Sequence, residues 1–148
     1  AVFEREQRYR EAEGAFRRAL DRDPEDAATL NYLGYMLAER GERLDESVDL
    51  IQRALVLDPN NGSYLDSLGW AYLKQNRLEL AERPLRQASD QLRRNSVVQD
   101  HLGDLLFRLE RYTEAISAWE RALAGDGDTV DLSVIQSKIR DSQARLPR

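Results

Sequence analysis

Four alanines spaced 35, 34 and 34 residues apart limit the possible folds of this chain more than any other feature. They are Ala19, Ala54, Ala88 and Ala122. Three further columns keep the same spacing: Phe16, Ile51, Leu85 and Trp119; Ala12, Ser47, Ala81 and Ala115; Tyr9, Leu44, Leu78 and Tyr112. Repeats of this length are typical of solenoids, in which each unit buries its apolar face only by stacking on its neighbours.

The pattern inside each unit predicts a helical hairpin. In the third unit, residues 65–72 follow the i, i+3, i+4, i+7 spacing of one helix face, and a second face spans 78–88 after a break at 75–77. Pro24 and Pro59 close the first two units, because proline cannot continue a helix. We therefore expect an all-α chain.

Three glycines, Gly34, Gly69 and Gly103, fall inside the first helices of these hairpins. Glycine inside a helix costs about 1 kcal/mol relative to alanine. Close approach of the paired helix, helped by its alanine column, would offset that cost.

Together these residues resemble the tetratricopeptide repeat, a helical hairpin of about 34 residues with a Leu-Gly pair, two later alanines and a closing proline. The resemblance implies a right-handed α-solenoid of about three and a half hairpins and a C-terminal capping helix. The expected units are a truncated first repeat (1–26), three full repeats (27–61, 62–95 and 96–129), and the capping helix with its tail (130–148).

Several positions depart from this pattern. The column spacing places one extra residue in the turn at 40–43. Ala1 corresponds to the middle of a first helix, so we expect an incomplete first hairpin in a piece of a longer protein. Arg93 replaces a closing proline, which leaves the preceding helix free to run on. Pro84 either kinks that helix or is tolerated on its outer surface, and we favour the outer surface.

The repeat period stops after Ala124. Residues 125–128, Gly-Asp-Gly-Asp, predict a turn. Leu132, Ile135 and Ile139 then predict a one-sided amphipathic helix that extends to about Arg145. A polar outer face suits the terminal helix that such arrays need for solubility.

A narrower resemblance covers residues 30–35, 44–46 and 64–70. These stretches are similar to the C-terminal repeat block of long bacterial tetratricopeptide proteins, some of which are envelope lipoproteins or periplasmic scaffolds. Residues 100–104 and the closing helix at 135–139 fit the same group. The resemblance implies a scaffold or adaptor, and favours the bacterial periplasm or cell envelope over the cytoplasm.

In such arrays the first helices line the concave face, and helical geometry identifies the residues opposite each packing stripe. The candidate ligand-binding residues are Asn31, Tyr32, Tyr35, Asp66, Trp70, Lys74, Asp100, His101, Asp104 and Arg108. Tyr35 and Trp70 would be aromatic anchors. The aspartates would favour a basic or amide-rich ligand. Alternatively, the aromatics only pack against neighbouring helices and the aspartates are solvated.

Two more specific sites are not favoured. Capture of a C-terminal carboxylate, known for one subclass of these repeats, needs basic residues and asparagine on the first helices. Only Asn31 fits, since Lys74 and Arg108 lie in the last turns. His101, the only histidine, with its neighbouring aspartates is a weak signal for a metal, so we expect a solvated or groove-lining side chain.

Composition excludes several classes of function. A net charge of −5 and a pI near 5.0 argue against nucleic-acid binding through phosphate neutralisation. Absence of cysteine excludes disulfides and thiolate sites. No run approaches the roughly 20 apolar residues of a membrane span. No nucleophile–histidine pair or phosphate-binding loop is present, so we expect neither catalysis nor a cofactor.

The favoured hypothesis is a non-catalytic scaffold that binds a peptide or protein segment in its concave groove, with a basic or aromatic-rich ligand expected. The alternative is a structural module that stacks through its N-terminal edge, from Ala1 to Tyr9, on preceding repeats or on a second copy to form a homo-oligomer.

Overall fold

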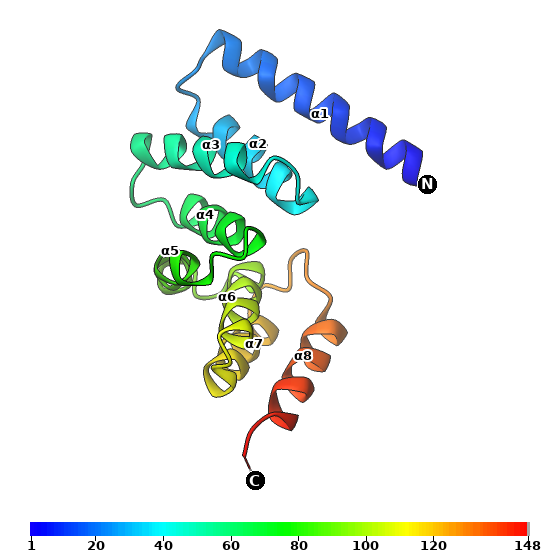
Figure 1. Cartoon of the computed structure of the whole chain (residues 1–148), viewed down its shortest axis with the longest axis vertical. Coiled ribbons are helices and arrows are strands. Elements are labelled where there is room, and N and C mark those ends of the chain that lie inside the picture. Colours follow the sequence, from blue (N-terminus) through cyan, green and yellow to red (C-terminus); the bar gives the residue numbers. More distant parts are fainter. Residues whose placement is uncertain (148) are drawn as a thin grey trace.

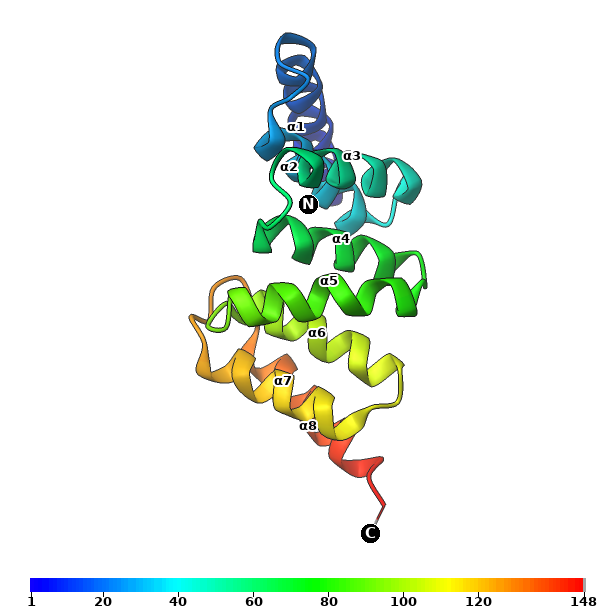
Figure 2. The same ribbon diagram turned by 90° about the vertical axis from the view of Figure 1, so that its left-hand side faces the viewer.

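The computed structural model describes residues 1–147, which form helices and turns but no strand (Figure 1). The helices are α1 (Val2–Arg22), α2 (Ala27–Arg40), α3 (Leu44–Leu57), α4 (Gly62–Lys74), α5 (Leu78–Gln91), α6 (Ser96–Arg108), α7 (Tyr112–Ala124) and α8 (Leu132–Ala144). They follow one another down the long axis of the molecule (Figure 2). The expected all-α solenoid is confirmed. Arg148, the last residue of the expected tail, lies outside the described residues.

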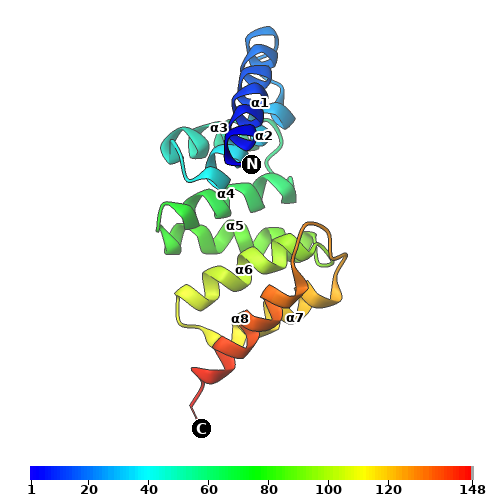
Figure 3. The ribbon, with the colours of Figure 1, turned by 90° about the vertical axis from the view of Figure 1, so that its right-hand side faces the viewer.

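Helices α2 to α7 form three hairpins, each made of a first and a second helix. The first helices α2, α4 and α6 also pack on one another in sequence, and therefore form one continuous side of the stack. Helix α8 packs on α7 at the C-terminal end (Figure 3). This is the position that a capping helix takes.

The first unit is a single helix and not the expected remnant of a hairpin. Helix α1 runs without a break through residues 5–8, where the other units turn. Those residues are Arg-Glu-Gln-Arg, all good helix formers, so their own propensity favours continuation of the helix over a turn. No residue of α1 is fully buried, because the helix packs on α2 along one side only.

Side-chain caps begin each first helix at a repeating position. Asp26 accepts a hydrogen bond from the Thr29 amide, and Asn61 and Asn95 do the same for the amides three residues further on. Asp131 caps α8 through the Ser133 amide. These caps satisfy amides that have no partner within the helix.

The extra residue of the second unit is taken up near the turn at 40–43. Helix α2 has 14 residues, whereas α4 and α6 have 13. The turn then contains two residues with left-handed backbone, Gly41 and Arg43, whereas the later turns contain one each, Asn76 and Glu110. Glycine adopts this conformation at no steric cost.

Two expectations for α5 were wrong. The helix ends at Gln91 and does not run on, although Arg93 replaces the proline. The Asn95 amide donates to the Leu92 carbonyl, and the Asn95 side chain caps α6, so the turn forms without proline. Pro84 is buried rather than on the outer surface.

The repeating columns form the core. Ala54, Ala88 and Ala122 have no exposed surface. The glycines allow close packing of each pair: a Cβ atom on Gly34 would lie 2.6 Å from Cγ1 of Ile51, and one on Gly69 would overlap with Leu85. Within residues 1–147, no helix is long and apolar enough to cross a membrane.

Candidate functional site

Three adjoining hollows form one groove along α2, α4 and α6. The loop hollow, about 260 Å³, lies beside the α7–α8 loop. The central hollow, about 370 Å³, shares Tyr35, Val97 and Thr129 with it. The aromatic hollow, about 370 Å³, shares Trp70, Asp104 and Lys138 with the central one. Neighbouring hollows share lining residues, so the three lie next to one another along the first helices.

All ten candidate residues line this groove. Their exposure differs widely. Tyr32 is 59% exposed, Lys74 and Arg108 are also exposed, and Tyr35 and Trp70 are half-buried. Asn31, Asp66 and His101 are buried at the groove floor, with 8% or less of each residue exposed. A ligand could therefore reach the aromatic and basic residues directly, but the buried polar groups only at their margins.

Of the two expectations for His101, solvated or groove-lining, the side chain lines the groove but is buried rather than solvated. Its Nδ1 lies 2.9 Å from Oδ1 of Asp66, so α6 is bonded to α4 inside the stack. Burial disfavours the imidazolium, but the nearby carboxylates, Asp66 first and then Asp104 and Asp100, together outweigh that effect and raise the pKa of His101. The ring of Trp70 stacks on the imidazole with centroids 4.0 Å apart. This pairing explains how two polar side chains are tolerated in the interior.

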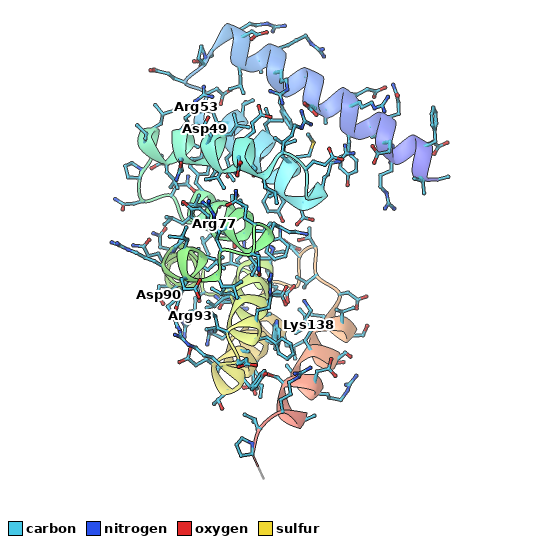
Figure 4. All side chains as sticks on the ribbon, in the orientation of Figure 1. Asp49, Arg53, Arg77, Asp90, Arg93 and Lys138 are labelled. Carbon is cyan, nitrogen blue, oxygen red and sulfur yellow. The ribbon has the colours of Figure 1, made fainter. Side chains whose placement is uncertain are left out.

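Asp100 and Asp104 are also not free to attract a basic ligand. Lys138 of α8 donates to Oδ1 of Asp100 at 3.0 Å and to Oδ1 of Asp104 at 2.9 Å. Figure 4 shows Lys138 on the side of α8 that faces the array. Trp119 donates its indole N–H to the same Asp100 oxygen. Burial and the nearby Asp100 raise the pKa of Asp104, although Lys138 opposes the shift.

The two predicted aromatic anchors lie at the middle of the groove. Trp70 donates its indole N–H to Glu39 Oε1 at 2.6 Å, which links α4 to α2. Burial raises the pKa of the Tyr35 hydroxyl, and the carboxylates of Glu39 and Asp66 add to the shift. Both side chains are therefore held by neighbours while part of each ring faces the groove.

Sequence reasoning missed the second wall of the groove, which α8 and the α7–α8 loop provide. The loop is fixed by Ser96, whose hydroxyl donates to the Ala122 carbonyl and accepts from the Gly127 amide. A signal for Lys138 existed: it falls at the i, i+3 position between Ile135 and Ile139, on the packing face of α8.

No group of three or more histidine and carboxylate side chains is arranged to hold a metal ion within residues 1–147. The groove instead combines aromatic surfaces with charged groups on two facing walls. Such a surface can bind a polypeptide segment by burial of apolar side chains and by ion pairing at its margins.

The sequence pattern of the tetratricopeptide repeat matches residues 2–62 and 67–131, and the chain belongs to this family. A comparison with curated protein sequences gave no match.

Solved structures of similar proteins share the fold. MamA of AMB-1 is 25% identical, with a TM-score of 0.74 over 95% of this chain and 80% of the other. The Sgt2 repeat domain from Aspergillus fumigatus is 23% identical, with a TM-score of 0.67 over 83% and 86% of the two chains. The first repeat domain of Spaghetti (RPAP3), bound to the HSP90 peptide SRMEEVD, is 21% identical, with a TM-score of 0.69 over 80% and 93%.

Proposed function

We propose that this chain is a non-catalytic protein-interaction module that holds a peptide or protein segment in the groove along α2, α4 and α6. The observation that carries the proposal is the succession of three adjoining hollows lined by Tyr32, Tyr35 and Trp70. Partly exposed aromatic side chains in a concave surface are the usual anchors of protein interfaces. The peptide-bound RPAP3 domain, which shares this fold, supports a role of this kind.

The α7–α8 loop and α8 restrict what the groove can hold. They form a wall opposite the first helices, so the ligand is enclosed on two sides. An extended segment or a single helix fits such a channel better than a flat protein surface does. The scaffold or adaptor role that the narrower bacterial resemblance implies is compatible with this geometry.

The experiment is affinity capture from the source cell with the chain as bait, followed by the same capture with groove variants. We expect Tyr32→Ala and the double variant Tyr35→Ala/Trp70→Ala to lose partners that the unchanged chain retains. Tyr32→Ala is a more specific test than the double variant, because the Tyr32 side chain is largely exposed and its removal should leave the fold intact.

Val56→Ala provides the matched control. Val56 is 80% exposed on α3, outside the groove, so this variant should retain every partner. Circular dichroism and thermal unfolding must show that each variant is folded. Partners retained by the folded groove variants would contradict the proposal.

The self-assembly alternative makes a different prediction. Val2 and Phe3, 78% and 81% exposed, would be covered by a second copy or by further repeats. Substitution of Phe3 would then change the mass measured by sedimentation, whereas the groove variants would not. Phe16, also on α1, packs against the core that contains Leu30, Leu33 and Leu37 and stacks near Tyr32, so its substitution would not test assembly alone.

A further inference from the structure

The aromatic hollow differs from the other two in the character of its walls. It lies between the C-terminal turns of α4 and α6 and the face of α8, and its apolar lining comes from Trp70, Leu73, Phe107 and Trp119. Its volume of about 370 Å³ falls in the range of pockets that enclose ligand groups. Aromatic walls on three helices suit a bulky apolar side chain.

Two cations at the rim of this hollow have no carboxylate within ion-pair distance among residues 1–147. Lys74 Nζ lies 5.1 Å from the centroid of the Trp70 ring, and it makes no hydrogen bond to the described part of the chain. Arg108 donates to the Leu73 carbonyl and to Oδ1 of Asn76. A guanidinium has five N–H donors, so Arg108 can still bind a carboxylate.

The remaining charged residues of the lining are Asp104 on α6 and Lys138 and Asp141 on α8. Lys138 is engaged by Asp100 and Asp104, and therefore contributes little to an incoming anion. Asp141, exposed on α8, would repel one. Among the lining residues, the positive charge available to a ligand is therefore on the α4–α6 side, at Lys74 and Arg108. Arg145, at the end of α8, adds a guanidinium 5.0 Å from the centroid of the Phe107 ring.

We infer that the aromatic hollow receives a bulky apolar side chain from an acidic ligand segment, whose flanking carboxylates pair with Lys74 and Arg108. This inference rests on the proposed function and adds the chemical class of the ligand at one end of the groove. It reverses the expectation of a basic ligand at this end, because the aspartates that suggested one are already engaged. Charge complementarity at the rim selects the partner, while burial in the hollow supplies most of the affinity.

Synthetic peptides provide the test. Three capped series carry one central tryptophan flanked by aspartates, by lysines or by serines, and fluorescence anisotropy reports their binding to the whole chain. We expect the aspartate series to bind about fivefold more tightly than the serine series, since two exposed ion pairs each contribute a fraction of a kcal/mol. The lysine series should bind more weakly than either.

Single substitutions test whether the peptides bind in the aromatic hollow. Lys74→Glu should remove the preference for aspartate with little effect on stability, because Lys74 makes no hydrogen bond within the described chain. Phe107→Ala should weaken all series, whereas Asp141→Asn should bind the aspartate series as tightly or more tightly. Tyr32→Ala, in the loop hollow, should leave this binding unchanged.

The outcomes separate the inference from the proposed function. If the lysine or serine series binds as tightly as the aspartate series, or if Lys74→Glu has no effect, the inference is wrong while groove binding stands. If peptides of all three series fail to bind, and Tyr32→Ala still captures the partners of the unchanged chain, both the inference and the proposed function are wrong.

Discussion

His101 on α6 and Asp66 on α4 form a buried pair, with Nδ1 and Oδ1 2.9 Å apart, directly beneath the aromatic side chain of Trp70. Neither side chain of the pair is more than 8% exposed. The pair therefore joins two adjacent repeats and also supports the surface on which a ligand is expected to rest. Stability of the array and geometry of the groove depend on the same contact.

Stability of the chain should depend on pH through this pair. The pKa of His101 is raised in the folded state above its ordinary value of 6.5. The protonated pair therefore stabilises the fold fully below about pH 6.5, and the contribution is lost as pH rises through the higher folded-state pKa. Denaturant unfolding across this range should show falling stability toward alkaline pH.

Asp66→Asn is the matched variant for the pH prediction. It keeps the shape of the side chain but removes the charge that raises the His101 pKa, so the alkaline decrease in stability should become smaller. An unchanged pH profile in this variant would show that the pair does not carry the effect.

Glycine to alanine substitutions should have opposite effects at different sites. At Gly69 or Gly103 the new Cβ would overlap with Leu85 or Trp119, and we expect a loss of about 1–3 kcal/mol of unfolding free energy. At Gly14, in α1, the Cβ meets only the mobile end of Arg18 at 3.2 Å. There alanine should stabilise the helix by about 0.5–1 kcal/mol.

Chemical denaturation of the three glycine variants side by side gives the comparison. Equal effects at all three positions would contradict the close packing of the hairpins.

Replacement of Lys138 by methionine should weaken the attachment of α8. It leaves Asp100 and Asp104 next to each other without their cation, at a cost of about 1–3 kcal/mol for the partly buried carboxylates. Faster amide hydrogen exchange in α8 than in α6 would report local detachment. Addition of Asp104→Asn should recover part of the loss. No change in α8 exchange would mean that the ion pairs are not what holds the helix.

Much of the fold could be predicted from the sequence, because the same pattern of core residues recurs in each unit. The alanine columns and helical glycines identified the hairpins, and Leu132, Ile135 and Ile139 identified α8. The continuous helix at α1 could not be predicted from the columns. In the later units a turn precedes the residue that corresponds to Tyr9, but that turn also depends on a first helix paired with the second helix. The end of α5 was also mispredicted, because the prediction rested on the missing proline alone, whereas Asn95 caps α6 and the turn forms without proline.

The sequence predicted the positions of the candidate site residues, but not their hydrogen-bond and ion-pair partners. All ten residues line the groove, and their role in ligand binding stays a prediction. Helical geometry could not show that Asp66 pairs with His101 or that Asp104 pairs with Lys138, because each pairing joins helices far apart in the sequence. The side that α8 encloses likewise depends on the path of the α7–α8 loop, which no repeat position specifies.

The most direct test of groove binding is amide hydrogen exchange of the whole chain with and without a captured partner. The account predicts that protection on binding concentrates in α2, α4 and α6 around Tyr35 and Trp70, and in the facing part of α8. Protection confined to α1, or to the outer sides of α3, α5 and α7, would contradict it.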